Sequence, residues 1–203
     1  MKITLEMIKD LRNKTGAGIT VVKQALEKYD GDPEKALIFL REKGLAKALK
    51  RAEKRAANGL IVSYIHGNGS LGVLLELNSE TDFAAKSEKF QELAHEIALQ
   101  IAANNPEYIA IENIPAEVME REKDLAIKDI DPKKPQQVRE KIIEGKLQKY
   151  YLDFVLLEQP YFKDESKKIK DLINDYVAVL GEKIEIGRFC RFKLAGSAVS
   201  CNL

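Results

Sequence analysis

The sequence has few of the residues and patterns that mark metal centres, disulfide frameworks and membrane spans. Cysteine and histidine each occur twice in 203 residues, and the formal net charge is +1. The longest apolar stretches are well short of the ~20 residues that a spanning helix needs, and residues 1–6 carry an acid and a base where a signal sequence would be apolar. We therefore expect a cytoplasmic protein with no membrane partner and no global charge that would recruit nucleic acid.

The two cysteines, Cys190 and Cys201, lie close together near the C-terminus and do not form a Cys-x-x-Cys pair. This spacing suggests neither a zinc site nor a disulfide framework. We expect free thiols, with a bond between two chains as the alternative.

The patterns of enzyme active sites are also missing. His66 falls in a predicted turn and His95 beside an apolar helical stripe, without the spacing of metal ligands. Residues 16–18 (GAG) lack the lysine and the hydroxyl residue of a phosphate loop, and helix capping explains them better. No pair of carboxylates stands out for acid–base work. We expect no catalytic residue, metal or cofactor, and a binding protein in preference to an enzyme.

The first 44 residues have the pattern of a compact three-helix bundle. Thr4 can cap the first helix, Gly16 can end it, and Asp32 with Pro33 can start the third, which is expected to finish before Gly44. The apolar residues at helical spacing are Leu5, Ile8 and Leu11, then Val21, Val22, Ala25, Leu26 and Tyr29, then Ala36, Leu37, Phe39 and Leu40. A bundle this small suits a docking module.

Three strands are predicted further along the chain. Residues 60–65 and 71–77 form a hairpin, because the turn between them contains two glycines. A third antiparallel strand at 184–194 should complete the sheet with one mostly buried face. Its alternating residues are Ile184, Ile186, Cys190, Phe192 and Leu194.

Helices account for most of the remainder. Residues 45–57 read as a helical linker ended by Asn58-Gly59, and residues 114–161 as two charged helices that form an antiparallel hairpin. Two amphipathic helices follow the period of 3.6, one with Phe90, Leu93, Ala94, Ile97, Ala98 and Ile101, and one with Ile169, Leu172, Ile173, Tyr176, Val177 and Leu180.

An aromatic residue stands where a buried strand should end and a helix begin. Residues 78–82 are polar and turn-forming, and Phe83 follows them directly. The ring could fold back as a local staple against the next helix, or it could be presented to another molecule. On pattern alone the staple is favoured.

A basic stripe offers an alternative function. Lys43, Lys47, Lys50, Arg51, Lys54 and Arg55 recur every three or four residues on the expected linker helix. The stripe could serve an RNA-binding protein. Since no aromatic interleaves with the charges to stack on bases, a solvated helix face is the favoured interpretation, and nucleic acid is an unlikely partner.

Four segments along nearly the whole chain match known signature blocks in order and spacing. They are residues 11–18 with 23–26 (LRNKTGAG, KQAL), 40–48 (LREKGLAKA), 76–83 (ELNSETDF), and 143–147 with 156–161 (IEGKL, LLEQPY). Together they resemble the elongation factor Ts family, the bacterial exchange factors for the GTPase elongation factor Tu. Ser79 replaces a frequent cysteine of the family, Ala84 a frequent valine, and Ile19 and Thr20 two frequent methionines.

The resemblance implies a partner and a division of labour between two sites. It implies that elongation factor Tu is bound, with Phe83 entering a gap near its magnesium site, Asp82 at the rim, and Thr81 and Ala84 in the same motif. It further implies that the N-terminal bundle grips the nucleotide domain through Arg12, Gly16, Ile19 and Thr20. The chain is short for the family, so two copies are expected to pair, through the sheet near Cys190.

The expected fold is therefore α+β, with a UBA-like three-helix bundle, a helical linker and a three-stranded antiparallel sheet covered by helices, from which a helical hairpin protrudes. The predicted divisions are 1–44 for the bundle, 45–57 for the linker, 58–113 with 162–195 for a core that serves dimerisation, 114–161 for the inserted hairpin and 196–203 for a flexible tail.

Overall fold

The computed structural model describes residues 3–15, 17–51, 53–128, 130–131, 134–195 and 200–202. The chain forms two compact units, each assembled from separate segments. The first comprises Met1–Val62, Glu76–Glu96 and Asp171–Gly187, and the second comprises Ser63–Leu75, Ile97–Lys170 and Arg188–Leu203. Helices and an antiparallel sheet make up the described chain, which confirms the predicted α+β class.

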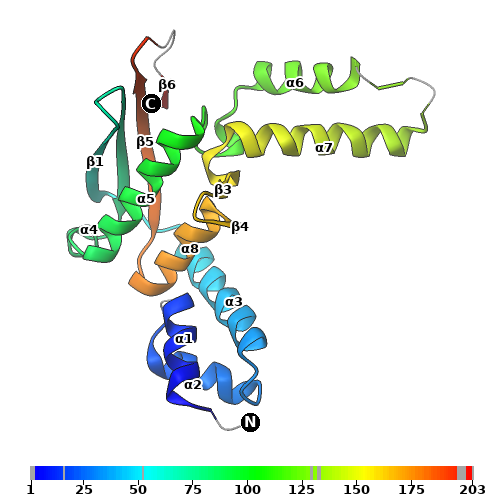
Figure 1. Cartoon of the computed structure of the whole chain (residues 1–203). Helices are drawn as coiled ribbons and strands as arrows, with labels where there is room; N and C mark the ends of the chain where they lie inside the picture. Colours follow the sequence, from blue (N-terminus) through cyan, green and yellow to red (C-terminus); the bar gives the residue numbers. More distant parts are fainter. Residues whose placement is uncertain are drawn as a thin grey trace. The chain divides into compact units, whose positions relative to one another are not determined.

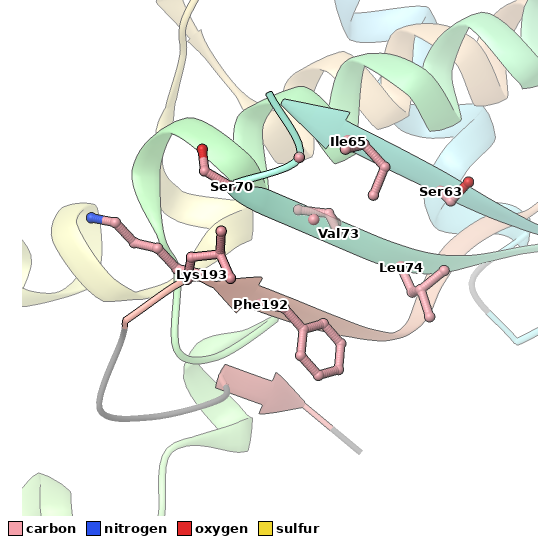
Figure 2. A pocket seen from close by; sticks show the side chains of 10 residues that line it. Ser63, Ile65, Ser70, Val73, Leu74, Phe192 and Lys193 are labelled. Carbon is pink, nitrogen blue, oxygen red and sulfur yellow. The ribbon is translucent and has the colours of Figure 1, made fainter. Parts of the chain in front are cut away.

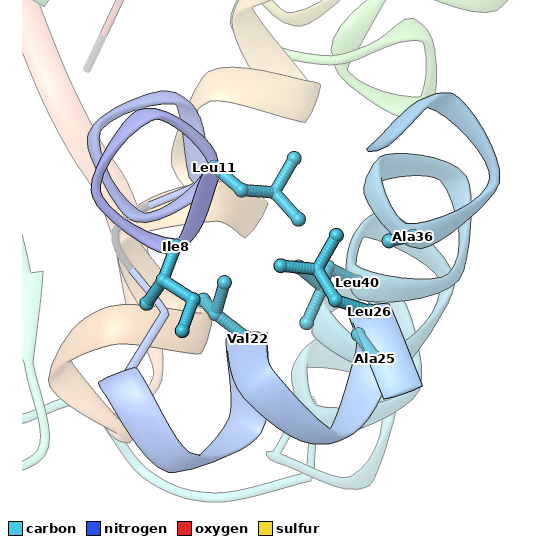
Figure 3. Close-up of a cluster of buried hydrophobic side chains, with 7 residues drawn as sticks. All are labelled: Ile8, Leu11, Val22, Ala25, Leu26, Ala36 and Leu40. Atoms are coloured by element: carbon cyan, nitrogen blue, oxygen red, sulfur yellow. The ribbon is translucent and has the colours of Figure 1, made fainter. Parts of the chain in front are cut away.

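The first unit begins with three helices around a small apolar core. They are α1 (Leu5–Thr15), α2 (Ile19–Lys28) and α3 (Pro33–Arg51). Figure 3 shows side chains from all three helices converging, namely Ile8, Leu11, Val22, Ala25, Leu26, Ala36 and Leu40. Leu5 is an exception, because it is the first residue of α1 and its side chain is exposed.

The predicted caps of the bundle are present where the chain is described. Thr4 Oγ1 accepts the backbone N–H of Met7 at 3.2 Å, and Asp32 Oδ1 accepts those of Glu34 and Lys35 at 3.0 and 3.1 Å. Gly16, predicted to end α1, lies outside the described residues.

Helix α3 continues through Gly44, which corrects the predicted helix ends. The third helix was expected to finish before Gly44 and the linker helix to reach residue 57, but one helix spans Pro33–Arg51. Gly44 is buried, and a Cβ added there would lie 3.1 Å from Cβ of Ala178 in α8 (Ile169–Leu180). Glycine at this position therefore permits close helix packing and does not terminate the helix.

The main sheet has four strands in the order β1-β2-β5-β6. β1 (Asn58–His66) and β2 (Leu71–Ser79) are the predicted hairpin, and β5 (Ile184–Lys193) is the predicted third strand beside β2. Asn58 and Gly59 open β1 and do not close a linker helix.

The fourth strand, β6 (Ser200–Asn202), corrects two predictions about the C-terminus. β6 pairs antiparallel with β5, and Cys190 stands directly opposite Cys201, so a disulfide joins them within the chain. The expectation of free thiols was wrong, since strand pairing brings the two Cα atoms to 4.1 Å. Residues 200–202 of the predicted flexible tail are a strand, while 196–199 and 203 lie outside the described residues.

The buried face of β5 changes partway along the strand. Ile184 and Ile186 are buried, Gly187 and Arg188 are both exposed, and Phe189 is buried. Two consecutive exposed residues shift the alternation by one position. Cys190, Phe192 and Leu194 therefore do not continue the buried face as predicted, and Phe192 and Leu194 are exposed.

The second unit contains the predicted helical hairpin. α6 (Ala116–Lys128) and α7 (Gln136–Phe154) lie side by side (Figure 1), with Lys146 Nζ 3.3 Å from the carbonyl oxygen of Ala126 and Tyr151 Oη 3.5 Å from Sδ of Met119. Ala126 is the one buried residue of these two helices.

The predicted amphipathic helices are also found. The apolar stripe of α5 (Glu88–Asn104) is buried as predicted, and Ser87 Oγ accepts the N–H of Phe90 at 3.3 Å. Gly181 ends α8 with φ +74°, a backbone angle that glycine adopts without strain. Short elements complete the fold: α4 (Asp82–Ala85), the 3-10 turns η1 (Ile111–Asn113) and η2 (Leu156–Glu158), and a separate pair β3 (Pro160–Tyr161) and β4 (Asp164–Lys168).

Candidate functional site: an exposed phenylalanine on a fixed turn

Phe83 lies in the short helix α4, which begins after Glu80 and Thr81 at the end of β2, and 81% of its surface is exposed. The two residues that follow, Ala84 and Ala85, are buried. The local staple that the pattern favoured is therefore wrong, because the ring does not pack against its own chain. A large aromatic side chain without a core position is typical of a contact with another molecule.

The residues on either side of Phe83 are held by side-chain hydrogen bonds. Thr81 caps α4, its Oγ1 accepting the N–H of Ala84 at 3.3 Å. Lys86 Nζ lies 2.7 Å from Oδ2 of the exposed Asp82, and this hydrogen bond holds the pKa of Asp82 below its usual value. Asp82 is therefore ionised at neutral pH and forms an ion pair with Lys86.

Two glutamates fasten the backbone before Phe83. The carboxylate of Glu182, in the turn after α8, accepts the Thr81 N–H at 3.0 Å and the Thr81 hydroxyl at 2.7 Å. The carboxylate of Glu80 accepts hydrogen bonds from Arg51 at 2.8 and 2.9 Å and from the Lys183 N–H at 2.7 Å. The bond from Arg51, followed by that from Lys183, keeps the pKa of Glu80 low.

The first two residues of β1 contact the segment of chain that precedes Phe83. Asn58 Nδ2 donates to the Glu80 carbonyl at 2.7 Å. Gly59 has φ +154°, and a side chain there would collide with the Leu77 carbonyl and approach Cα of Asn78 to 2.8 Å. Only glycine fits where β1 approaches β2 this closely. The Asn58-Gly59 pair therefore marks the close approach of two strands, and its interpretation as the end of a helix was wrong.

Sequence reasoning missed Arg51, Asn58 and Glu182 as parts of this site. Arg51 was assigned to a surface stripe and Asn58 to a helix end, while Glu182 follows a helix-ending glycine and has no pattern of its own. No local signal connects them, because they come from three separate segments of the chain.

The predicted docking residues lie on both sides of the turn between α1 and α2. Arg12 is exposed in the last turn of α1, and Ile19 and Thr20 are exposed at the start of α2. Gly16 lies outside the described residues. A cavity of about 290 Å³ adjoins this turn, lined by Ala17, Gly18, Val21, Leu40, Lys43, Gly44, Ala46, Lys50 and Ala178.

The basic stripe is not a continuous helix face. α3 ends at Arg51, so Lys54 and Arg55 lie beyond the helix, and Arg51 is paired with Glu80. Lys43 and Lys50 are exposed on α3, while the side chain of Lys47 is outside the described part of the chain. The regular spacing that suggested RNA binding therefore does not correspond to one surface.

The described residues lack the features of two other kinds of protein. They contain no group of three or more histidine, cysteine, aspartate or glutamate side chains arranged to hold a metal ion. Among the helices that can be described, none is long and apolar enough to cross a membrane.

Comparison with known proteins matches nearly the whole chain. The family model described as elongation factor TS matches residues 40–195. Elongation factor Ts of Coprothermobacter proteolyticus is 53% identical over 195 residues, which cover 96% of this chain and 99% of that protein. Elongation factor Ts of Thermodesulfovibrio yellowstonii is 53% identical over 194 residues (96% and 97%), and that of Acetivibrio thermocellus is 48% identical over 192 residues (94% and 89%).

These similarities agree with the four sequence blocks and include the segment that carries Phe83. The family model begins within α3, while the full-length relatives also extend over most of the N-terminal bundle. The chain belongs to the elongation factor Ts family.

Proposed function

We propose that this protein is a cytoplasmic guanine nucleotide exchange factor for elongation factor Tu. It promotes GDP release during translation elongation by inserting Phe83 near the magnesium and phosphate site of the GTPase, and it stabilises the nucleotide-free state. The observation that carries the proposal is an aromatic ring, 81% exposed, on a turn whose backbone is fixed by several hydrogen bonds.

The mechanism follows from how a GTPase holds its nucleotide. The phosphates and a magnesium ion supply most of the binding energy, so dissociation is slow unless their site is distorted. A factor accelerates release by binding the distorted, empty state better than the loaded one. By reciprocity, nucleotide that returns to the GTPase expels the factor.

Insertion of Phe83 alone is too weak to account for nucleotide release, so a second contact with the GTPase is required. Burying a phenylalanine contributes about 1.5–3 kcal/mol, which corresponds to a factor of about 10 to 150. The remainder comes from the docking turn, with Arg12, Gly16, Ile19 and Thr20 gripping the nucleotide domain. Thr81 and Ala84 hold the backbone that presents the ring, and Asp82 supplies polar contacts at its rim.

Fluorescent GDP release from elongation factor Tu tests this function directly. The GTPase is loaded with a fluorescent GDP analogue, chased with excess GDP and titrated with the protein. We expect a release rate that rises with protein concentration and saturates, and a nucleotide-free complex that separates when GDP is added. Failure to accelerate release at any concentration would contradict the proposal.

Salt distinguishes exchange from RNA binding. An apolar insertion loses little when salt is raised, whereas binding to RNA phosphates weakens steeply. We expect the maximal release rate to change little over the salt range in which a phosphate-dependent complex dissociates.

We further propose that two copies of the chain pair through the outer face of the sheet. In the second unit Ile65, Leu74, Phe192 and Leu194 are exposed and surround a groove of about 520 Å³. Figure 2 shows Leu74 and Phe192 on the neighbouring strands β2 and β5 at this groove. An exposed apolar face of this kind suits a self-complementary, two-fold contact.

Because Cys190 is bonded to Cys201 within the chain, this contact does not require a bond between chains.

A further inference from the structure

The turn that carries Phe83 and the turn after α8 bind each other through two glutamates. Glu80 accepts the N–H of Lys183, and Glu182 accepts the N–H of Thr81. Each carboxylate thus holds the amide that directly follows the other glutamate in the sequence. We call these four residues, Glu80, Thr81, Glu182 and Lys183, the carboxylate clasp. Neither turn can shift without breaking a hydrogen bond to a charged group, which is stronger than one between neutral groups.

Arg51 connects this clasp to the N-terminal bundle. Its Nη1 lies 2.8 and 2.9 Å from the two carboxylate oxygens of Glu80, whose side chain is 17% exposed. Arg51 is the last residue of α3, and α3 is one uninterrupted helix that also supplies Ala36 and Leu40 to the bundle core. One ion pair therefore links the helix of the docking bundle to the Phe83 turn.

The position of Phe83 depends on contacts from other segments, because its own ring and its own helix make few stabilising contacts. Its ring is exposed, and α4 has four residues, far fewer than an independently stable helix needs. Buried Ala84 and Ala85 anchor the C-terminal side of the turn, while the clasp fixes the N-terminal side. The direction of the ring is thus set by a backbone that other segments hold in place.

We propose that Arg51 is a positioning residue for nucleotide exchange, because its ion pair with Glu80 orients the Phe83 turn relative to the helix that carries the docking bundle. This inference rests on the proposed exchange function. Arg51 acts through Glu80 and need not touch the GTPase. Its loss leaves docking intact and lowers the rate at which docked factor releases GDP, since a misplacement of about 1 Å can cost up to about a hundredfold in rate.

The test compares Arg51→Gln with Arg41→Gln, the same change at an exposed position of the same helix. GDP release is titrated with each variant. We expect Arg51→Gln to lower the maximal rate about tenfold and to change the half-saturating concentration by less than about twofold. Arg41→Gln leaves both unchanged, and Arg51→Lys, which keeps the charge, recovers part of the rate. An Arg51→Gln variant with the wild-type maximal rate would overturn the inference.

Three further variants separate positioning from general loss of structure. If Arg51 acts through Glu80, the double variant Arg51→Gln/Glu80→Gln has the same maximal rate as Glu80→Gln alone. If the two substitutions lower the maximal rate additively, Arg51 does not act through Glu80. Glu182→Gln keeps one acceptor oxygen and removes the other, so it is expected to lower the maximal rate without lowering Tm greatly, and an unchanged rate in this variant also counts against the clasp.

Amide hydrogen exchange tests the clasp independently of exchange activity. The Lys183 amide should exchange about tenfold faster or more in Glu80→Gln than in the wild type, while amides of the bundle core are unchanged. If the wild-type protein fails to release GDP but this protection is found, the proposed function fails and the clasp stands. If release is normal but the Lys183 amide is unaffected, the clasp fails and the proposed function stands.

Discussion

Phe83 and Phe192 are both exposed phenylalanines, but their surroundings differ. Phe83 is 81% exposed on a four-residue helix, with polar residues before it and hydrogen bonds that hold the backbone. Phe192 is 48% exposed on a strand, beside the exposed side chains of Leu74 and Leu194. An isolated ring needs a pocket in its partner, whereas a ring within an apolar face needs a second apolar face. Exposure alone therefore does not define the type of contact.

The largest effect is expected for Phe83→Ala. Removing the ring should lower the maximal GDP release rate about 10- to 150-fold, the range of the energy of one buried phenylalanine. Much of the affinity for the GTPase should remain, because the docking turn is unchanged. Titrated GDP release measures both quantities, and Phe162→Ala, at another exposed phenylalanine, is the matched control. If Phe83→Ala loses affinity and keeps its rate, Phe83 is only a contact residue.

Phe192→Asp tests whether the apolar face around Phe192 is the contact between two copies of the chain. A charge placed in an apolar contact should weaken pairing of two copies by about 2 kcal/mol or more, a factor of about 30. Sedimentation equilibrium measures the dissociation constant of the pair. Phe83→Ala should leave pairing unchanged, and a Phe192→Asp variant that pairs like the wild type would show that the sheet face is not the contact.

Arg12→Ala sharpens the distinction between docking and insertion. The exposed Arg12 is expected to contribute about 1 kcal/mol to association, so its loss should raise the half-saturating concentration about fivefold. The maximal release rate should be unchanged, the reverse of Phe83→Ala. An equal loss of binding in both variants would contradict two separate roles.

The smallest effect concerns the pH dependence of stability at Glu80. Because its pKa is lowered from the usual 4.5 in the folded state, Glu80 stabilises the fold above pH 4.5, and this contribution is lost as pH falls through the lowered pKa. Glu80→Gln should therefore reduce the free energy of unfolding by about 1 kcal/mol at neutral pH and by progressively less in acid.

Urea unfolding at a series of pH values checks this expectation. Phe192→Ser is the control. Neither side chain titrates, so the change in the free energy of unfolding should not vary with pH in the same way. A Glu80→Gln difference that is the same in acid as at neutral pH would show that the carboxylate charge is not what holds the turn.

The sequence predicted the features that depend on local periodicity. The bundle core, the strands of the hairpin, the paired charged helices and the stripe of α5 all follow from apolar spacing, and each is found in the structure. The position of Phe83 at a strand end was also visible. Its exposure did not follow from the pattern, because a staple and a presented ring share the same pattern, and only the family resemblance implied it.

Features that depend on distant segments could not be predicted. Glu80 and Glu182 meet only after β2 and α8 are placed, and neither has a distinctive neighbour pattern. The disulfide was missed because it requires β6, a strand of three residues with no apolar alternation. The exposure of Phe192 was missed because Gly187 and Arg188 shift the strand by one position, and a strict alternation cannot represent such a shift.

Strand β6 also limits how two molecules can approach each other. Because it is hydrogen-bonded along β5 and covalently attached through Cys190, it occupies the backbone donors and acceptors at the paired positions of that border. A second molecule therefore cannot pair a strand of its own with β5 at Phe189–Arg191. It can reach this part of the sheet through the open edge of β6 or through a face of the sheet, and on a face the shapes of the side chains select the partner.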